Sequence, residues 1–193
     1  MPPKAKFTRE EIIEAALDIV KTDGFEALTS RALGTRLGSS ARPIFTVFQS
    51  MDEVQQAVIE SAKALYKEYV DQGLMWEHPF KGVGTKYILF AVNEPKLFQL
   101  LFMAEQPGIP DLSGVLPLIE ESYKEILLSI QNDYGISEPL AEKLYRHLWI
   151  YTHGIATLCA TKMCRFTNDE ISSMITEVCT GILKNIKEYK NDD

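Results

Sequence analysis

The spacing of capping residues, apolar residues and glycines over residues 8–50 constrains the fold more than any other feature of the chain. Thr8-Arg9-Glu10-Glu11 has the pattern of a capping box, in which a threonine hydroxyl and a glutamate carboxylate three residues later each accept an orphan backbone N–H. Apolar residues then recur at helical spacing as far as Val20, and Gly24 is expected to end the segment as a left-handed cap. We predict a first helix over about residues 8–23.

Two shorter helices are expected next. Thr29 can cap the second helix, and Gly38 closes it. Ser40 can cap a third helix, which places Pro43 at its third position, where the missing N–H would have had no intrahelical partner. Three short helices separated by tight turns are the layout of a helix-turn-helix.

The remainder of the chain reads as helical, with no convincing period-2 strand, repeat or low-complexity tract. We therefore predict an all-α fold of about nine helices, with an N-terminal three-helix helix-turn-helix domain and a larger C-terminal helical domain. The expected domains are residues 6–52 and 73–190, linked through a fourth helix at 53–72. The further expected helices end at Asn93, open at Pro95 and span about 115–133, 138–163 and 168–189, with a loop over residues 105–114.

The charge of the chain is unevenly distributed. The net charge is −7, but residues 1–50 carry seven basic and six acidic side chains, which leaves −8 for the other residues. Residues 27–51 hold three arginines and no carboxylate. The acidic groups are therefore concentrated away from the predicted helix-turn-helix, which permits binding to nucleic acid without requiring it.

Membrane and secretory signals are not evident in the sequence. No apolar run approaches the ~18 residues that a membrane span needs, and the N-terminal segment has no apolar stretch behind its charges. We expect a cytoplasmic protein with no membrane partner. Its three cysteines, Cys159, Cys164 and Cys179, are then expected to be reduced and to pack as small apolar residues.

The segment from Leu28 to Val54 resembles, along its full length, the DNA-binding signature of the TetR family of transcriptional regulators. The apolar spacing, the turn glycine, the aromatic residues Phe45 and Phe48, and the Ser50-x-x-Glu53 start of the fourth helix coincide with that signature. The resemblance implies a homodimer that binds a palindromic site on double-stranded DNA. Three positions depart from the family pattern, which usually has tyrosine, lysine and alanine where this chain has Phe45, Met51 and Gly34.

Candidate DNA contacts follow from the third helix, the expected reading helix, and from the caps. The first residues of a reading helix face base edges in the major groove, and an arginine there can make a bidentate contact to guanine. Helix N-termini with hydroxyls suit phosphate oxygens. Arg31, Arg36 and the basic arm of Lys4, Lys6 and Arg9 are candidates for the DNA backbone, and the resemblance places Phe45 and Thr46 beside the groove wall. The predicted DNA-binding residues are Thr29, Ser30, Arg31, Ser40, Ala41, Arg42, Phe45 and Thr46.

The last two expected helices are suited to dimerisation, because they combine an aromatic anchor, small residues that allow close approach and an apolar stripe. The alternative is that these residues pack only within the subunit. The predicted dimer interface consists of Trp149, Thr152, Ala156, Ala160, Ile171, Ile175, Val178 and Ile182.

The middle of the chain and the segment Leu148-Trp149-x-x-x-His153-Gly154 are similar to a subclass of TetR C-terminal domains with a Trp…His-Gly motif. The resemblance implies a pocket for a small effector, often apolar, and a repressor that the effector releases from its operator. Each candidate lining residue could equally be plain core. These residues are Tyr87, Phe90, Phe102, Met103, Trp149 and His153.

Other functional classes are less well supported by the sequence. We predict no enzyme, cofactor or metal, because the three histidines lack ligand spacing and no nucleotide-binding loop or nucleophile motif is present. Two alternatives stay open. One is a helical interaction protein whose DNA reading has decayed, which the departures at Phe45 and Met51 would explain. The other is a regulator that senses oxidants through its three cysteines.

Overall fold

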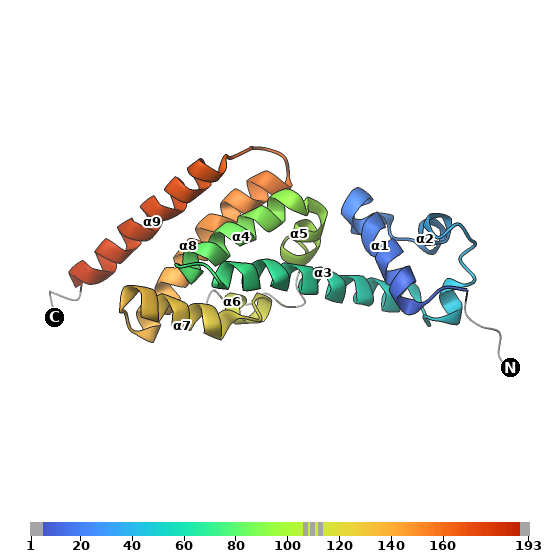
Figure 1. Cartoon of the computed structure of the whole chain (residues 1–193), viewed down its shortest axis with the longest axis horizontal. Coiled ribbons are helices and arrows are strands. Elements are labelled where there is room, and N and C mark those ends of the chain that lie inside the picture. The colour runs from blue at the N-terminus through green and yellow to red at the C-terminus, as the bar shows by residue number, and fades with distance from the viewer. Residues whose placement is uncertain (1–5, 106–107, 109–110, 112–113, 190–193) are drawn as a thin grey trace. The chain divides into compact units, whose positions relative to one another are not determined.

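The computed structural model describes residues 6–105, 108, 111 and 114–189, and within these residues the regular structure is entirely helical (Figure 1). The prediction of an all-α fold is confirmed. No helix in the described ranges is long and apolar enough to cross a membrane. The α-helices are α1 (Arg9–Asp23), α2 (Ser30–Arg36), α3 (Met51–Leu74), α4 (Pro79–Asn93), α5 (Pro95–Phe102), α6 (Val115–Ile119), α7 (Tyr123–Tyr134), α8 (Glu138–Ala160) and α9 (Asn168–Tyr189), and two 3₁₀ turns are η1 (Phe25–Ala27) and η2 (Ile44–Thr46).

The first helix is capped at its N-terminus as the sequence predicts. The backbone N–H of Thr8 donates to Glu11 Oε2 at 2.8 Å, and the Glu11 N–H donates to Thr8 Oγ1 at 3.2 Å. At the other end, Gly24 has φ 95° and ψ 169°, which is not the left-handed conformation that was expected there. The positive φ favours glycine at this position. Because ψ is extended, the chain does not fold back over the helix but continues directly into η1.

The helices divide into two compact units. The first unit contains the chain as far as Leu65 together with Glu94–Ala104, and the second contains Tyr66–Asn93 and the chain from Glu105 onward. Helix α5 therefore belongs with the N-terminal helices, whereas the expected division at residue 73 had placed it in the C-terminal domain. It packs against α1, and Lys21 of α1 forms an ion pair with Glu94 at 3.0 Å.

The second unit is built around α4, which packs against α7, α8 and α9. Two glycines allow the end of α3 to meet the start of α4. A Cβ atom on Gly73 would lie 2.7 Å from the carbonyl carbon of Gly82, so neither position has room for a side chain. This crossing holds the second half of α3 beside α4, and the aromatic side chains of both helices meet there. The rings of Tyr66 and Tyr87 are 6.0 Å apart in an edge-to-face arrangement.

The expected single helix over 115–133 is wrong, because the chain leaves the helical conformation between α6 and α7. Glu120 is extended, with φ −123° and ψ 105°. Its carboxylate takes the backbone N–H of Ser122 at 3.1 Å, so that N–H is bonded to a side chain and not to a carbonyl one turn earlier. A new helix then begins at Tyr123, and Glu120 is left with its side chain inside the unit, 7% exposed.

Candidate nucleic-acid interface and ligand cavity

The segment expected to read DNA is a 3₁₀ turn and not an α-helix, so the prediction of a third helix capped by Ser40 is wrong. Its backbone bonds run three residues apart, from Ile44 N to Ala41 O and from Thr46 N to Pro43 O. Pro43, with φ −62° and ψ −27°, directly precedes the 3₁₀ turn η2 and caps it. The backbone of Ser40 and Ala41 is held close to Gly34 of α2 instead of starting a helix.

Gly34 sets how closely α2 approaches this turn. A Cβ atom at Gly34 would lie 2.9 Å from both the backbone nitrogen of Ala41 and the carbonyl carbon of Ser40. In addition, the Ser39 N–H donates to the Gly34 carbonyl at 2.8 Å. The departure from the alanine of the family pattern therefore has a packing cause, because the backbone of the turn occupies the space of a side chain.

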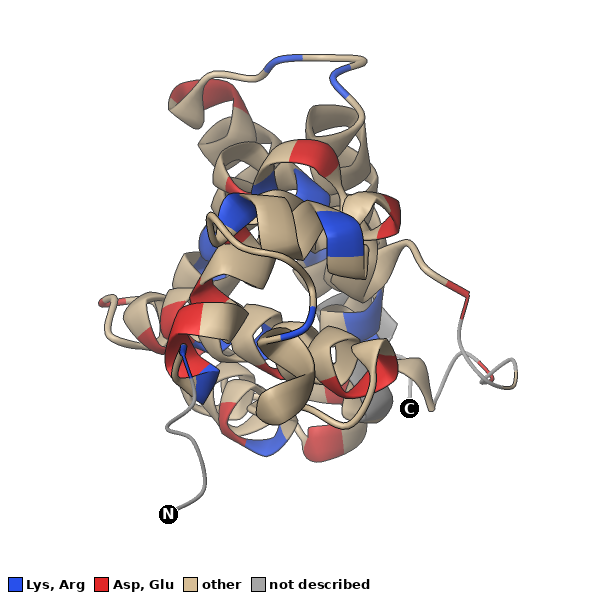
Figure 2. Ribbon diagram, turned by 90° about the vertical axis from the view of Figure 1, so that its right-hand side faces the viewer, with Lys and Arg blue, Asp and Glu red and all other residues tan. Residues whose placement is uncertain are grey.

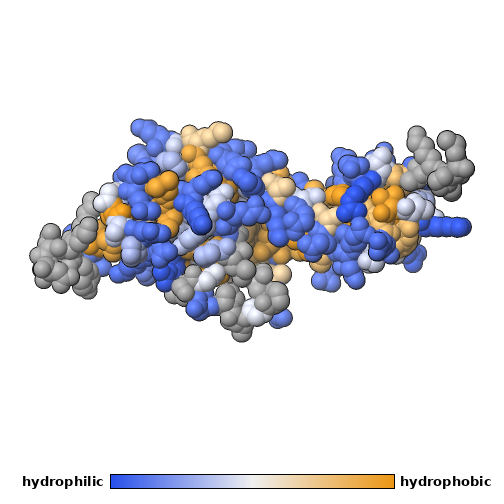
Figure 3. Space-filling model, turned by 90° about the horizontal axis from the view of Figure 1, so that it is seen from below, coloured by the Kyte–Doolittle hydropathy of each residue, from blue (hydrophilic) through white to orange (hydrophobic). Residues whose placement is uncertain are grey.

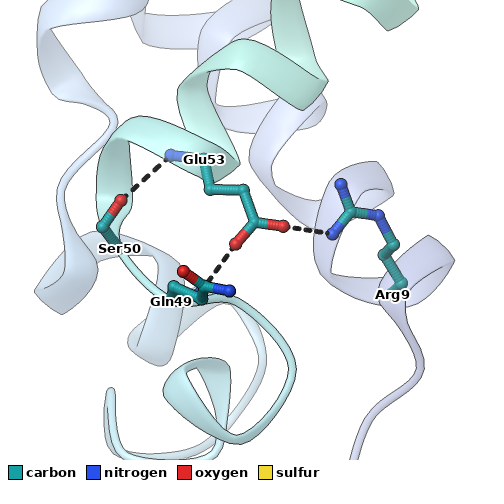
Figure 4. Close-up of polar contacts among 4 residues, drawn as sticks. All are labelled: Arg9, Gln49, Ser50 and Glu53. Atoms are coloured by element: carbon teal, nitrogen blue, oxygen red, sulfur yellow. Dashed lines mark hydrogen bonds and ion pairs between the residues drawn. The ribbon is translucent and has the colours of Figure 1, made fainter.

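Glu53 connects the residue that follows the reading turn to the first helix (Figure 4). The reading turn is defined here as residues 40–48. The two carboxylate oxygens of Glu53 accept the Gln49 N–H and the Arg9 guanidinium, each at 2.8 Å. The Glu53 N–H in turn donates to Ser50 Oγ at 3.2 Å, as a helix cap. These bonds hold the pKa of Glu53 below its ordinary value, the backbone bond from Gln49 being the largest cause. Arg9 also lies over the Phe48 ring, 4.3 Å from its centroid.

Most side chains predicted to contact DNA are accessible on the first unit. Ser30 and Ala41 are half-buried, and the hydroxyls of two others have local partners. Thr29 Oγ1 accepts the Ala32 N–H at 3.2 Å, and Thr46 Oγ1 donates to the Pro43 carbonyl at 2.6 Å. The exposed members of the predicted set are Thr29, Arg31, Ser40, Arg42, Phe45 and Thr46.

The basic side chains of the first unit fall into two groups. Arg36 forms an ion pair with Asp18, and Lys6 Nζ donates to Ser39 Oγ at 3.1 Å, so both are engaged within the unit. Within the described ranges, no ion pair or hydrogen bond holds the guanidinium of Arg31 or Arg42. Figure 2 shows the mixture of basic and acidic residues on this side of the protein. Lys4, predicted as part of a basic arm, lies outside the described residues.

The second unit contains a cavity of about 350 Å³ lined mainly by aromatic and aliphatic side chains. Its wall comes from α3, α4, α6, α7, α8 and α9. Such a volume lies near the lower end of the ~300–1,000 Å³ that is common for small-molecule sites. The aromatic lining residues are Tyr66, Phe80, Tyr87, Tyr134, Tyr145 and Trp149.

Four residues predicted to bind a ligand do not line this cavity. Phe102 and Met103 belong to the first unit, where Phe102 packs on Phe98 with ring centroids 5.2 Å apart. Phe90 is fully buried among aromatic rings, which leaves it no open side. His153 lies behind the wall, where its Nδ1 shares a hydrogen bond of 2.8 Å with the hydroxyl of Tyr87.

Tyr87 and Trp149 are the two predicted ligand-binding residues that the structure places on the cavity wall. They come from α4 and α8, the pair of helices that packs most extensively in the unit. The bond from Tyr87 to His153 orients the phenol ring, and burial lowers the pKa of His153, which favours its neutral form. Part of the Trp…His-Gly motif is therefore connected to the cavity, His153 through Tyr87 and Trp149 directly.

Glu120, whose buried carboxylate lines the cavity, is not among the ligand-binding residues expected from the sequence. Tyr66 donates its hydroxyl to Glu120 Oε2 at 2.7 Å, and the Ser122 N–H binds the other oxygen. Burial raises the pKa of Glu120, although both hydrogen bonds act in the opposite direction. A signal was present in the sequence: Glu120 is the one charged residue on a stripe of apolar spacing formed with Leu116, Tyr123, Leu127 and Ile130.

Five residues predicted for the dimer interface are buried within the subunit, and their placement there is corrected. Helices α8 and α9 pack on each other and on α4, which covers these side chains before any partner is present. Two of them, Thr152 and Ile175, line the cavity instead. Trp149, Val178 and Ile182 keep part of their surface accessible. The five buried residues are Thr152, Ala156, Ala160, Ile171 and Ile175.

The cysteines and other potential ligands offer little chemistry. Burial raises the pKa of the Cys159 and Cys179 thiols, which disfavours the reactive thiolate. Cys164 is exposed. Within residues 6–105, 108, 111 and 114–189, no group of three or more histidine, cysteine, aspartate or glutamate side chains could hold a metal ion.

A comparison with known protein families identifies the family of this chain. The family described as Tetracyclin repressor-like, C-terminal domain, matches residues 80–178, just over half of the chain. An uncharacterized HTH-type transcriptional regulator of Mycobacterium tuberculosis is 35% identical over 54 residues, which cover 28% of this chain and 25% of that protein. The match thus spans about a quarter of the length of this relative.

Among solved structures, the fold is similar to that of a Clostridium perfringens protein described as a candidate fatty acid metabolism regulator. The TM-score is 0.58 and the sequences are 16% identical, with 90% of this chain and 96% of that chain covered. At this level of identity the likeness concerns the fold alone.

Proposed function

Because the chain belongs to the TetR family of transcriptional regulators, we propose that it is a repressor that leaves a palindromic operator when a small effector fills its cavity. The observation that carries the proposal is the pairing of two features in one chain. An exposed arginine with no partner among the described residues lies on the reading turn of one unit, and a largely apolar cavity lies in the other. A DNA-binding regulator has to be in the same compartment as the DNA, so we propose that this protein is cytoplasmic.

DNA recognition would depend chiefly on Arg42. Its guanidinium is exposed and has no partner within the described ranges, so binding to guanine O6 and N7 would break no existing ion pair. Arg31 and the hydroxyl-bearing start of α2 would contact phosphate oxygens and fix the register. Phe45, 45% exposed, would pack against the sugar-phosphate wall without the hydrogen bond that a tyrosine could donate.

Two copies would be needed to read a palindrome, because a two-fold dimer places its reading elements one DNA turn apart, ~34 Å. We propose that the accessible faces of α8 and α9 form the dimer. Val178 and Ile182 keep part of their surface accessible, and Ile150 of α8 is 48% exposed although it is a large aliphatic residue. Figure 3, a view from below, shows hydrophobic residues scattered among hydrophilic ones.

Release from DNA would follow from a difference in affinity. An effector that fits the cavity better in one arrangement of the dimer than in another shifts the protein toward the first arrangement. If the two reading turns are then at a spacing that does not match the operator, the affinity for DNA falls. By thermodynamic linkage, bound DNA weakens effector binding by the same factor.

The deciding experiment is selection from a randomised DNA pool by the full-length protein, with two arginine variants as a matched pair. We expect the wild type to enrich a palindrome. Arg42→Ala should lose roughly tenfold to hundredfold in affinity for that palindrome and relax its sequence, as expected for one bidentate base contact. Arg36→Ala removes the same charge from a side chain already paired with Asp18, and should retain the selected sequence.

Failure to enrich any sequence at low salt would overturn the proposal and favour the interaction protein with decayed DNA reading. The double variant Phe45→Tyr with Met51→Lys then separates two cases. Recovery of DNA binding would show a reader that lacks only phosphate donors. No recovery would direct attention to the second unit.

A further inference from the structure

The cavity of the second unit contains a buried carboxylate surrounded by aromatic rings, and this combination selects among ligands. Glu120 is 7% exposed and lines the cavity together with Tyr66, Tyr87 and Tyr145. Its partners, the Tyr66 hydroxyl and the Ser122 N–H, are neutral donors. Within the described part of the chain no salt bridge reaches this carboxylate.

The one cationic side chain that acts on the pKa of Glu120 in the described part of the chain does not neutralise it. Lys67 lowers the pKa of Glu120 only as the smallest contribution, and its ammonium is held by both oxygens of Asp71, at 2.7 and 2.9 Å. Lys81 and His78 also line the cavity, but both are more exposed than Glu120. Among the described residues, no cationic side chain forms the ion pair that normally compensates a buried carboxylate.

Aromatic rings complete a site suited to a positive charge. The ring of Tyr66 lies edge-on to that of Tyr87, and the ring of Phe80 lies edge-on to that of Tyr145, with centroids 6.0 and 5.6 Å apart. Faces of aromatic rings attract cations, most strongly where water is excluded, and cages of such rings recognise quaternary ammonium groups. The remaining aliphatic wall, which includes Leu116 and Ile175, suits a hydrocarbon tail.

We propose that the effector is an apolar organic cation, whose ammonium group is bound by the Glu120 carboxylate and the surrounding tyrosine rings. The proposal rests on the proposed function, because it names the ligand class of that same cavity. It favours a protonated or quaternary amine over a fatty acid of the same length, since a second carboxylate near Glu120 would add like-charge repulsion in a buried site.

The test compares ligands that share one tail and differ in the head group. Calorimetric titration of the full-length protein with decyltrimethylammonium, decanol and decanoate should give binding in that order, with the cation at least about tenfold tighter than the alcohol. Equal binding of cation and alcohol, or tighter binding of decanoate, would overturn the proposal on the wild-type protein alone, whatever any variant does.

Two glutamine substitutions assign the effect to the buried carboxylate. Glu120→Gln should remove the preference for decyltrimethylammonium over decanol. Glu121→Gln removes the same charge from the exposed neighbouring residue and should retain the preference. Retained preference in folded Glu120→Gln, shown by an unchanged helical circular dichroism spectrum, would also overturn the proposal.

Failure of this proposal and failure of the proposed function give different results. If the palindrome is enriched but the cation does not bind, the regulator stands and the ligand class is wrong. If the cation binds through Glu120 but never weakens binding to the selected palindrome, the cavity has the proposed ligand and the release mechanism is wrong.

Discussion

The two units of this protein differ in how completely they are packed. In the first unit the reading turn lies so close to α2 that position 34 has no room for a methyl group, and Phe48, the last residue of that turn, is 1% exposed. In the second unit six helices leave a cavity of about 350 Å³ with a carboxylate inside. Close packing therefore lies at the proposed DNA-contacting turn, and unfilled volume lies at the proposed effector site.

The largest expected effect comes from a hole in the tightly packed unit. Phe48→Ala should cost ~3–5 kcal/mol, as truncations of buried aromatic residues do, and should abolish DNA binding. If the units unfold separately, hydrogen exchange will rise in α1 and α2 while the second unit stays protected and still binds its ligand. Phe45→Ala, which truncates a 45% exposed ring, is the control and should change stability by less than ~0.5 kcal/mol.

Equal loss of protection in both units of Phe48→Ala would contradict separate unfolding, because it would mean that the two units unfold as one cooperative body.

A smaller effect is expected from adding one methyl group at the closest approach. Gly34→Ala should raise helix propensity by ~1 kcal/mol, yet it should destabilise the protein overall, because overpacking costs ~1–3 kcal/mol where backbone atoms obstruct the new group. Urea denaturation measures the balance. Thr35→Ala, on the exposed side of the same helix, should be neutral or stabilising. If Gly34→Ala is more stable than the wild type, the backbone of the reading turn can move away from α2 at little cost in free energy.

The smallest effects are expected in the response to pH, and here the two units should differ in sign. Burial raises the pKa of Glu120 above its ordinary value of 4.5, so the folded protein retains a proton that the unfolded chain releases. Its contribution to stability is complete below pH 4.5 and is lost as pH rises through the folded pKa. Tyr66, Tyr145, Glu121 and Lys67 also act on this site.

Glu53 in the first unit behaves oppositely. Its bonds to Gln49 and Arg9 lower its pKa below 4.5, so its contribution is present above pH 4.5 and is lost as pH falls through the folded pKa. Denaturation of Glu120→Gln and Glu53→Gln at several pH values tests both. The wild type should lose stability relative to Glu120→Gln as pH rises, and should gain stability relative to Glu53→Gln. The same slope for both variants would contradict the assignments.

Features that depend on neighbours along the chain could be predicted from the sequence. Thr8 and Thr29 cap α1 and α2 as expected, because a cap is satisfied by an N–H within three residues. The same local reasoning failed at Pro43. It treated the missing N–H as harmless at the third position of a helix, but the chain forms a 3₁₀ turn there, where α2 approaches closely at Gly34.

The ligand cavity could be predicted only in part. The family resemblance supplied all six candidates, but the sequence carries no signal for the direction of a side chain or for the unit to which it belongs. Of the six, the cavity wall contains Tyr87 and Trp149. An apolar stripe on a helix indicates that its side chains are buried. It does not indicate whether these side chains contact another helix, a second subunit or a cavity.

The all-helical class and the N-terminal caps of α1 and α2 follow from the sequence alone, because hydrogen bonds within one turn and a 3.6-residue period depend on residues close together in the chain. The tertiary structure was needed to place α5 in the first unit, to show why position 34 requires glycine, and to place Glu120 in the aromatic cavity. Those outcomes depend on which surfaces meet across long stretches of chain, and such distances leave no periodic trace in the sequence.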